Sequence, residues 1–238
     1  MLLNPYRFGV SGGDPLFSSV KFGANFTGTN GQTTAVDFSS SARAITFNGS
    51  AAISTAQSTF SAGSSLDLVG ASRNVSMPSS SDWSPIAGED FCWELVIYVP
   101  TLAGVTQDLL ATNNAGGVYP YRFYIFGGGG LGLLAFDTTP SLVINTTGGS
   151  LSAAAWHHVA FNREGSTVRI WIDGALVQSI GISTYGFAIS SGAMQIGAYQ
   201  PGVTDGLVYV QSARYTKGSA RYTGGGSFTP PSALFPTS

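Results

Sequence analysis

Charged side chains are scarce in this chain of 238 residues. Only 9% of the residues are charged, the formal net charge is −2, and Lys21 and Lys217 are the only lysines. Binding to nucleic acid requires a basic surface that displaces counterions from phosphates, so the composition excludes a nucleic-acid partner. The exterior must be built from Ser, Thr, Gly, Asn and Gln, which lose little side-chain entropy when they pack. This surface favours a subunit of a dense assembly, and a β-protein with polar loops is the alternative.

Long apolar runs and cysteines are also missing. No stretch of about 18 apolar residues exists, so we expect no membrane insertion. The start, Met1–Arg7, has neither the basic nor the apolar region of a signal peptide, so we expect a protein that is made in the host cytoplasm without a signal peptide. Cys92 is the only cysteine, and its strand-like neighbours indicate a buried hydrophobic residue rather than a reactive thiol.

Side chains for catalysis and metal binding are few. The two histidines and 12 acidic residues give no zinc-ligand set and no acidic cluster for calcium. Glycoside hydrolysis needs two carboxyl groups on one face, but no acid follows Glu94 along its strand, and we expect Glu94 to be exposed or bonded to a neighbour. A Ser-His-Asp set stays open, although the G-x-S-x-G motif is absent. The sequence therefore predicts a non-enzymatic protein with no catalytic residue, no metal site and no cofactor.

Strand patterns, in contrast, are abundant. Residues 155–163 and 166–174 are two aromatic and β-branched runs joined by a turn, which predicts a β-hairpin. Since neighbours on a strand point to opposite sides, we expect one of His157 and His158 in the core and the other at the surface. The longest predicted strand is Phe91–Val99, and its alternate apolar residues should face a core between two sheets: Phe91, Trp93, Leu95, Ile97 and Val99.

Turn residues divide the rest of the chain into short strands. The dipeptide Asn48-Gly49, between two such runs, predicts a tight hairpin. No convincing helical periodicity competes with this pattern. The further strands are predicted at residues 16–22, 44–47, 51–54, 66–69, 74–77, 108–111, 122–126, 131–136, 176–180, 193–198 and 207–213.

The chain divides into an arm and one domain. Residues 1–15 carry chain breakers rather than an apolar pattern, which predicts an extended N-terminal arm. Residues 16–238 show no second boundary and are expected to form a single β-sandwich domain. The arm is expected to dock the protein on a particle or on a sister copy, by main-chain contacts at a sheet edge, through Asn4, Pro5, Tyr6, Arg7 and Phe8.

The hairpin carries a family resemblance. Residues 156–174 resemble the W-H-H-V-A strand and the following V-R-I-W-I-D-G strand of laminin-G-like and concanavalin-A-like jelly rolls. Residues 58–68 look like the F-G-x-S-L-x-F element of that group, and residues 91–95 look like its F-T-I-E-F-W strand. The resemblance covers roughly residues 20–236 and implies an all-β fold, an antiparallel two-sheet jelly-roll sandwich of the concanavalin A-like and laminin G-like type.

The end of the chain resembles versions of this domain on bacteriophage structural proteins. Residues 212–223 and 228–231 are similar to the closing signature R-I-T-x-G-x-A-R-Y-T followed by F-T-P-P, and residues 4–8 are similar to the starts of such proteins. The resemblance implies a virion location, on the tail or as a capsid decoration. Other virion proteins, copies of the chain itself and a host glycan are the implied partners. A stand-alone lectin-like carbohydrate-binding module is the alternative.

One departure concerns calcium. Relatives often carry paired acids where residues 205–210 read Asp-Gly-Leu-Val-Tyr-Val, and this difference argues against a calcium site in this chain. Asp173, in the turn before Gly174, is expected to form turn hydrogen bonds. The repeat of Arg-Tyr at residues 214–215 and 221–222 is interpreted as edge packing, with arginine stacked on tyrosine.

Loop tyrosines are the candidates for ligand binding, because they offer a large contact area at low entropic cost. The alternative is that they pack over sheet edges. The same chemistry suits a glycan or a protein partner, and the sequence does not separate the two. The candidate ligand-binding residues are Tyr119, Tyr121, Arg122, Tyr185 and Tyr199.

Overall fold

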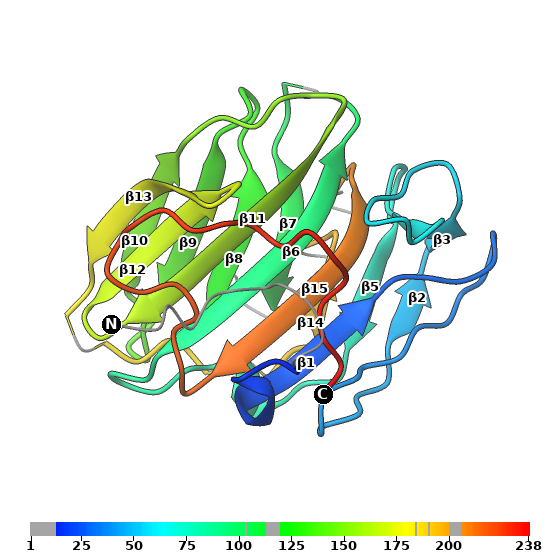
Figure 1. The fold of residues 1–238 in the computed structure, drawn as a ribbon. Helices are drawn as coiled ribbons and strands as arrows, with labels where there is room; N and C mark the ends of the chain where they lie inside the picture. Colours follow the sequence, from blue (N-terminus) through cyan, green and yellow to red (C-terminus); the bar gives the residue numbers. More distant parts are fainter. Residues whose placement is uncertain (1–12, 103, 113–119, 184, 190, 200–205) are drawn as a thin grey trace, which may run out of the picture.

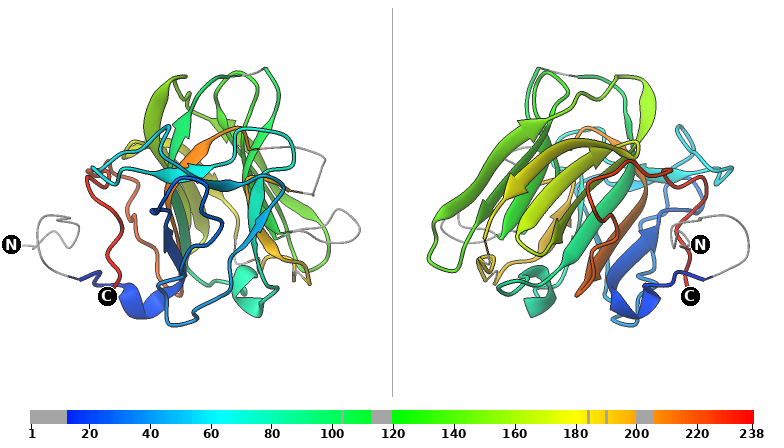
Figure 2. Two further views of the ribbon diagram at one scale, coloured as in Figure 1. Left: turned by 90° about the vertical axis from the view of Figure 1, so that its right-hand side faces the viewer. Right: turned by 60° about the vertical axis from the view of Figure 1, so that its left-hand side comes forward.

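The computed structural model describes residues 13–102, 104–112, 120–183, 185–189, 191–199 and 206–238. Its strands form two antiparallel sheets that face each other as two layers (Figure 1, Figure 2). In these ranges the only helical segments are two short 3-10 turns, η1 (Phe17–Ser19) and η2 (Ser81–Trp83). No helix in the described part of the chain is long and apolar enough to cross a membrane. The all-β, two-sheet prediction is confirmed.

The first layer is an eight-stranded sheet. Its central strands are the longest of the molecule, and β1 pairs with β15 beside the main path. In spatial order the sheet contains β13 (Ala175–Gly181), β12 (Thr167–Ile172), β11 (Ala155–Glu164), β6 (Phe91–Val99), β15 (Tyr209–Lys217), β4 (Ser65–Asp67) and β3 (Ala52–Ser54), with β1 (Val20–Asn25).

The second layer is a seven-stranded sheet, which packs its inner face against the first. Its spatial order is β10 (Leu142–Gly148), β9 (Leu131–Phe136), β8 (Tyr121–Ile125), β7 (Gln107–Thr112), β14 (Met194–Ile196), β5 (Asn74–Met77) and β2 (Thr46–Asn48).

The alternation of β6 places the core as predicted. The five residues from Phe91 to Val99 at every second position are all fully buried between the sheets. The β11–β12 hairpin is also confirmed: Arg163 pairs with Val168, and Gly165 supplies a positive φ of 58° at the turn. A one-residue slip would turn the apolar faces toward water, so this register is strongly specified.

The predicted hairpin at Asn48-Gly49 is wrong. The turn forms, with Gly49 at a φ of 57°, but its two strands belong to different sheets: β2 pairs with β5, and β3 pairs with β4. Turn chemistry fixes a chain reversal but does not choose the strand partner. Here the chain passes from the seven-stranded sheet to the eight-stranded sheet, and each short strand pairs with a strand of its own sheet.

The C-terminal segment, residues 218–238, covers part of the outer face of the eight-stranded sheet. In Figure 1 this segment, coloured red, runs in front of β11, β6 and β15. Tyr222 stacks on Phe228 with ring centroids 3.7 Å apart, and the main-chain N–H of Phe228 donates to the carbonyl of Gly174. Cys92 lies fully buried beneath this segment, as predicted, and burial raises the pKa of its thiol.

Buried charges lie under the same cover. Glu94, Arg214 and Asp14 have side chains with 0% exposure, and Arg214 bridges the two acids through bonds of 2.9 Å to each. Arg221 joins them by pairing with Asp14. Asp14 falls within the predicted N-terminal arm, yet its side chain is buried in this charge cluster with Arg214 and Arg221. Residues 1–12, including the proposed docking residues 4–8, lie outside the described part.

The arginine–tyrosine repeat is not the edge packing that the sequence suggested. The guanidinium of Arg214 lies 4.2 Å from the ring centroid of Phe235, and Tyr215 stacks on Trp93 in the core.

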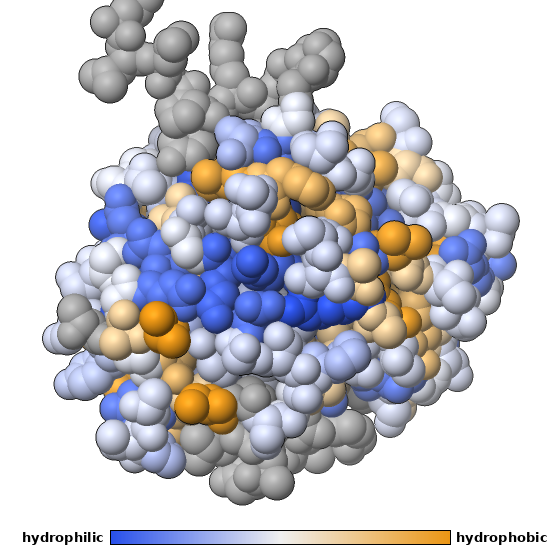
Figure 3. All heavy atoms as spheres, turned by 90° about the horizontal axis from the view of Figure 1, so that it is seen from below, coloured by the Kyte–Doolittle hydropathy of each residue, from blue (hydrophilic) through white to orange (hydrophobic). Residues whose placement is uncertain are grey.

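Charged groups also gather where β15 ends: Lys217 lies near Asp82 and Glu89, and Arg43 pairs with Asp82. Seen from below, a hydrophilic band crosses the molecule between hydrophobic patches (Figure 3).

Candidate functional site

Polar side chains occupy outward positions of the seven-stranded sheet. Val75 and Ile196 face the core, so their neighbours on β5 and β14 point to the opposite side. Asn48 on β2 lies opposite Asn74 on β5. Gln195 on β14 lies opposite Ser76 on β5. Three adjacent strands thus present amides and hydroxyls on one outer face.

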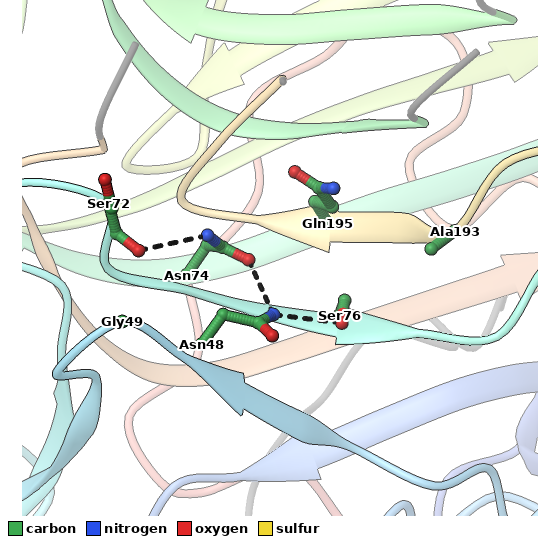
Figure 4. A pocket seen from close by; sticks show the side chains of 7 residues that line it. All are labelled: Asn48, Gly49, Ser72, Asn74, Ser76, Ala193 and Gln195. Carbon is green, nitrogen blue, oxygen red and sulfur yellow. Dashed lines mark hydrogen bonds between the residues drawn. The ribbon is translucent and has the colours of Figure 1, made fainter. Parts of the chain in front are cut away.

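These side chains line an open cleft of about 470 Å³ (Figure 4). We call it the amide cleft. None of the described residues that line it is charged, and its walls contain three carboxamides. It is lined by Asn48, Gly49, Ser72, Asn74, Ser76, Ala193 and Gln195.

A chain of hydrogen bonds orients the lower wall of the amide cleft. The Nδ2 group of Asn48 donates to Oδ1 of Asn74 at 2.8 Å and to Oγ of Ser76 at 3.0 Å. The Nδ2 group of Asn74 donates in turn to the carbonyl oxygen of Ser72 at 3.3 Å. Figure 4 shows this chain running along β2 and β5. The network fixes Asn48 and Asn74 before any ligand arrives.

Gln195 stands on the neighbouring strand, across the cleft from this chain (Figure 4). Its side chain is only 3% exposed, and among the described residues its carboxamide oxygen has no hydrogen-bond partner. A buried polar atom without a partner costs about 1–3 kcal/mol, so such atoms call for an explanation.

Arg122 continues the same outer face on β8. It lies opposite Ala111, which in turn lies opposite Gln195. Its guanidinium forms a bidentate pair with the buried Asp108 and lies 4.3 Å from the ring centroid of Tyr199 and 5.1 Å from that of Tyr124. The structure thus brings together two of the predicted binding residues, Arg122 and Tyr199. The charge of Arg122 is balanced by Asp108.

Tyr121 was wrongly predicted as a ligand-binding residue. It is fully buried, its hydroxyl accepts a 2.7 Å bond from Nε1 of Trp93, and burial raises the pKa of its phenol. The sequence predicted a strand that begins at Arg122, directly after a loop, but β8 begins at Tyr121, and alternation turns Tyr121 inward and Arg122 outward.

The remaining two candidates lie elsewhere. Tyr185 is 50% exposed, and its carbonyl oxygen accepts a hydrogen bond from the guanidinium of Arg163. Its neighbour Phe187 donates its main-chain N–H to the carbonyl of Pro85. Tyr185 therefore sits on a separate segment from the amide cleft. Tyr119 lies outside the described residues.

A Ser-His-Asp arrangement, left open by the sequence, is present. Nδ1 of His157 lies 2.7 Å from Oδ2 of Asp173, and Nε2 lies 3.1 Å from Oγ of Ser152. However, the main-chain N–H and carbonyl oxygen of Ser152 also lie within 3.2 Å of the same Nε2. An active nucleophile needs a separate oxyanion donor at this point. Here the N–H of Ser152 is directed at the imidazole, and the group fastens the loop before β11 to the turn after β12.

Both histidines are buried, which corrects the expectation that one would be at the surface. His157 is 8% exposed and His158 4%. Nε2 of His158 lies 3.1 Å from Oε2 of Glu94, which also accepts a 2.6 Å bond from the Tyr222 hydroxyl. Burial alone would raise the pKa of Glu94, but Arg214, His158 and Arg221 hold it well below its usual range. Glu94 is a structural acceptor, bonded to its neighbours and shielded from any substrate.

Metal ligands are not assembled in the described part of the chain. No group of three His, Cys, Asp or Glu side chains there has the geometry to hold an ion. The sequence did not single out Asn48, Asn74 and Gln195, because strand alternation alone does not show which polar positions meet across a sheet. Knowledge of the β2–β5–β14 pairing would have revealed them.

The geometry defines a jelly-roll sandwich of two antiparallel sheets with a polar cleft on one outer face. A family model of the concanavalin A-like lectin/glucanases superfamily matches residues 69–209, more than half of the chain. The chain belongs to this superfamily. No curated protein matches it closely enough to count as a relative.

Solved structures with the same fold include toxin binding domains. The receptor-binding domain of botulinum neurotoxin D has a TM-score of 0.62 and 11% identity, covering 84% of this chain and 50% of that one. The binding domain of Paraclostridial Mosquitocidal Protein 1 has a TM-score of 0.60 and 15% identity, covering 85% and 48%. The ligand-binding domain of botulinum neurotoxin D in complex with N-acetylneuraminic acid has a TM-score of 0.63 and 12% identity, covering 87% and 49%. The chain spans about half the length of these domains.

Proposed function

We propose that this protein is a non-enzymatic glycan-binding module whose ligand is an uncharged saccharide held in the amide cleft. The observation that carries the proposal is an uncharged cleft in which the pre-oriented amides of Asn48 and Asn74 lie beside Gln195, whose buried carboxamide oxygen has no hydrogen-bond partner among the described residues. Sugar hydroxyls donate and accept hydrogen bonds, and carboxamides match both roles. The superfamily and the sialic acid complex of one structural neighbour agree with a glycan ligand.

The chemistry of the cleft favours a neutral sugar. Its described lining residues carry no charge, and two arginines near it in the sequence or on the sheet, Arg73 and Arg122, are already paired with Asp67 and Asp108. A sialic acid carboxylate would lose its hydration without gaining a cationic partner there. Neutral hexoses and N-acetylhexosamines pay no such penalty.

Titration calorimetry with a panel of oligosaccharides tests the proposal. The panel contains maltohexaose, cellohexaose, chitohexaose and sialyllactose. We expect saturable binding of at least one neutral chain and none of sialyllactose at the same concentration. No detectable binding of any oligosaccharide in the panel, or a preference for the sialylated sugar, would contradict the proposal.

We further propose that the module is an adhesive subunit of a bacteriophage particle. The support is the resemblance of residues 212–231 to the closing signature of phage structural proteins, together with the sparse charge of the chain. The residues of this signature fasten the C-terminal segment: Arg221 pairs with Asp14, and Tyr222 bonds to Glu94. In this proposal residues 4–8 dock the subunit on other virion proteins or on sister copies, and the amide cleft meets a host glycan.

A truncation distinguishes docking from folding. Removing residues 1–12 should abolish incorporation into particles while leaving the melting temperature unchanged, because Asp14 and its two arginine partners remain. Asp14→Ala is the matched comparison and should lower the melting temperature. Normal incorporation of the truncated protein would refute the docking arm, and detection of the protein away from particles would refute the virion location.

A further inference from the structure

The outer face of the eight-stranded sheet is only partly covered. Toward one end of β11, β6 and β15, beyond the C-terminal segment, aromatic residues lie side by side on adjacent strands. Trp156 is opposite Tyr98, and Tyr98 is opposite Tyr209. The ring centroids are 5.6 Å apart in the first pair and 6.2 Å in the second. We call these three residues the aromatic row.

A small cleft of about 190 Å³ opens beside the aromatic row. Its floor contains Val96 and Trp156, and Pro230 and Pro231 of the C-terminal segment form one wall. Phe60 lies on another side, and Asp173 contributes a half-exposed carboxylate. Apolar ring surfaces with an acceptor at the margin suit a saccharide, whose faces are apolar and whose rim carries hydroxyl donors.

The backbone beside this cleft adopts an unusual conformation. Phe60 and Ser61 both have a φ of 56°, a region that bulky side chains rarely occupy. The surroundings hold this turn in place: the N–H of Thr59 donates to Oε1 of Gln211, whose Nε2 donates to the carbonyl of Ser64. Strain that is maintained by buried partners is characteristic of binding sites.

We propose that the aromatic row is a second saccharide site, on the sheet opposite to the amide cleft, which takes an uncharged oligosaccharide by stacking. The inference rests on the proposed function for the class of ligand. It adds that one domain binds glycan on both of its layers, by hydrogen bonds on the seven-stranded sheet and by aromatic stacking on the eight-stranded sheet. Two sites on one module raise its avidity for a surface that carries many glycans.

Tryptophan fluorescence reports on this site selectively. The chain has four tryptophans, and three of them, Trp83, Trp93 and Trp171, are fully buried. Trp156 is only partly buried, so acrylamide should quench mainly its emission. Trp156→Phe keeps an aromatic ring in the row but removes this signal, which verifies the assignment.

The experiment measures acrylamide quenching with and without each neutral oligosaccharide of the panel. We expect a saturating chain to protect Trp156 and to reduce the quenching constant at least twofold. Tyr98→Ala should weaken the affinity measured at this site by roughly tenfold, as the loss of one anchoring aromatic residue does. Phe126→Ala removes a 56% exposed aromatic residue outside both clefts and should change nothing.

The outcomes separate the two proposals. If calorimetry detects a glycan that leaves Trp156 unprotected, the aromatic row is not a site and the amide cleft stands. If Trp156 is protected but Gln195→Leu leaves all binding unchanged, the amide cleft fails and the row stands. If no glycan of the panel protects Trp156, or only a proline-rich peptide does, the second site is refuted.

Discussion

Nδ1 of His157 lies 2.7 Å from Oδ2 of Asp173, and the other oxygen of the same carboxylate accepts the main-chain N–H of His158 at 2.8 Å. This contact fastens the turn after β12 to β11. The hydrogen bond raises the pKa of His157, while partial burial lowers it. Burial works to raise the pKa of Asp173, but its bonds to His157 and His158 hold that pKa below its ordinary value.

The pair predicts a window of pH for its stabilising effect. The contribution of His157 to the free energy of unfolding is fully present below pH 6.5, the pKa of the unfolded histidine. It is lost as the pH rises through the raised pKa of the folded state. The contribution of Asp173 to the free energy of unfolding is present above pH 3.8, the pKa of the unfolded aspartate. It is lost as the pH falls through the lowered pKa of the folded state. The difference in unfolding free energy between wild type and Asp173→Asn should therefore be largest between these two values. Urea denaturation across the pH range measures it, and a difference that does not vary with pH would be contrary evidence.

Ser152 completes the triad-like set but, on this account, performs no chemistry. We expect hydrolysis of p-nitrophenyl acetate by the purified protein to match that of the buffer, and Ser152→Ala to leave this rate unchanged. The variant should cost little stability, because the main chain of residue 152 still contacts Nε2 of His157. A burst of p-nitrophenol that disappears in Ser152→Ala would show that the set is catalytic.

The buried charge cluster predicts large single-variant effects. Glu94 and Arg214 are both fully buried and bonded to each other. Arg214→Met should destabilise the domain by about 3–5 kcal/mol, because it removes the guanidinium that bridges two buried carboxylates and leaves Arg221 as their only arginine partner among the described residues. Adding Glu94→Gln should cost much less in the Arg214→Met background than in wild type. Denaturant unfolding of the four proteins measures the coupling, and additive effects would argue against the pairing.

Gln195 predicts a gain of stability at the expense of binding. Gln195→Leu removes a buried oxygen that lacks a partner, so the variant should be as stable as wild type or more stable by about 1 kcal/mol. Glycan affinity should fall at the same time. Thr112→Val is the matched control: its hydroxyl is also buried without a partner among the described residues, but it lies opposite Met194, which faces the core. This control should gain stability and keep its affinity; equal binding by both variants would exclude the amide cleft.

The sequence was sufficient for the layers but not for the site. The alternation of β6 and the β11–β12 hairpin were predictable, because period two and turn residues are local properties. The strand β10 was missed, since residues 142–148 alternate weakly and remain largely exposed at the sheet edge. The pairing of β2 with β5 depends on contacts between distant segments, and no local pattern specifies them.

The same limit explains the binding residues. Arg122 and Tyr199 were chosen as candidates because their residue types are typical of contact surfaces, and the structure joins them in a cation–π contact, while their binding role stays a prediction. Tyr121 was misplaced by one register position at the start of β8, which turned a core residue into a candidate ligand contact. The amides of Asn48 and Gln195 become a site only when β2, β5 and β14 lie side by side.

The side-chain amide resonances of Asn48, Asn74 and Gln195 give the most direct test of the central claim, that a saccharide occupies the amide cleft. In nitrogen-labelled protein, the Gln195 signal is assigned by its loss in Gln195→Leu, and the neutral oligosaccharide that binds in calorimetry is then titrated. The account predicts saturable shifts of these three amide signals at the calorimetric dissociation constant. Saturation of binding with all three signals unmoved would contradict it.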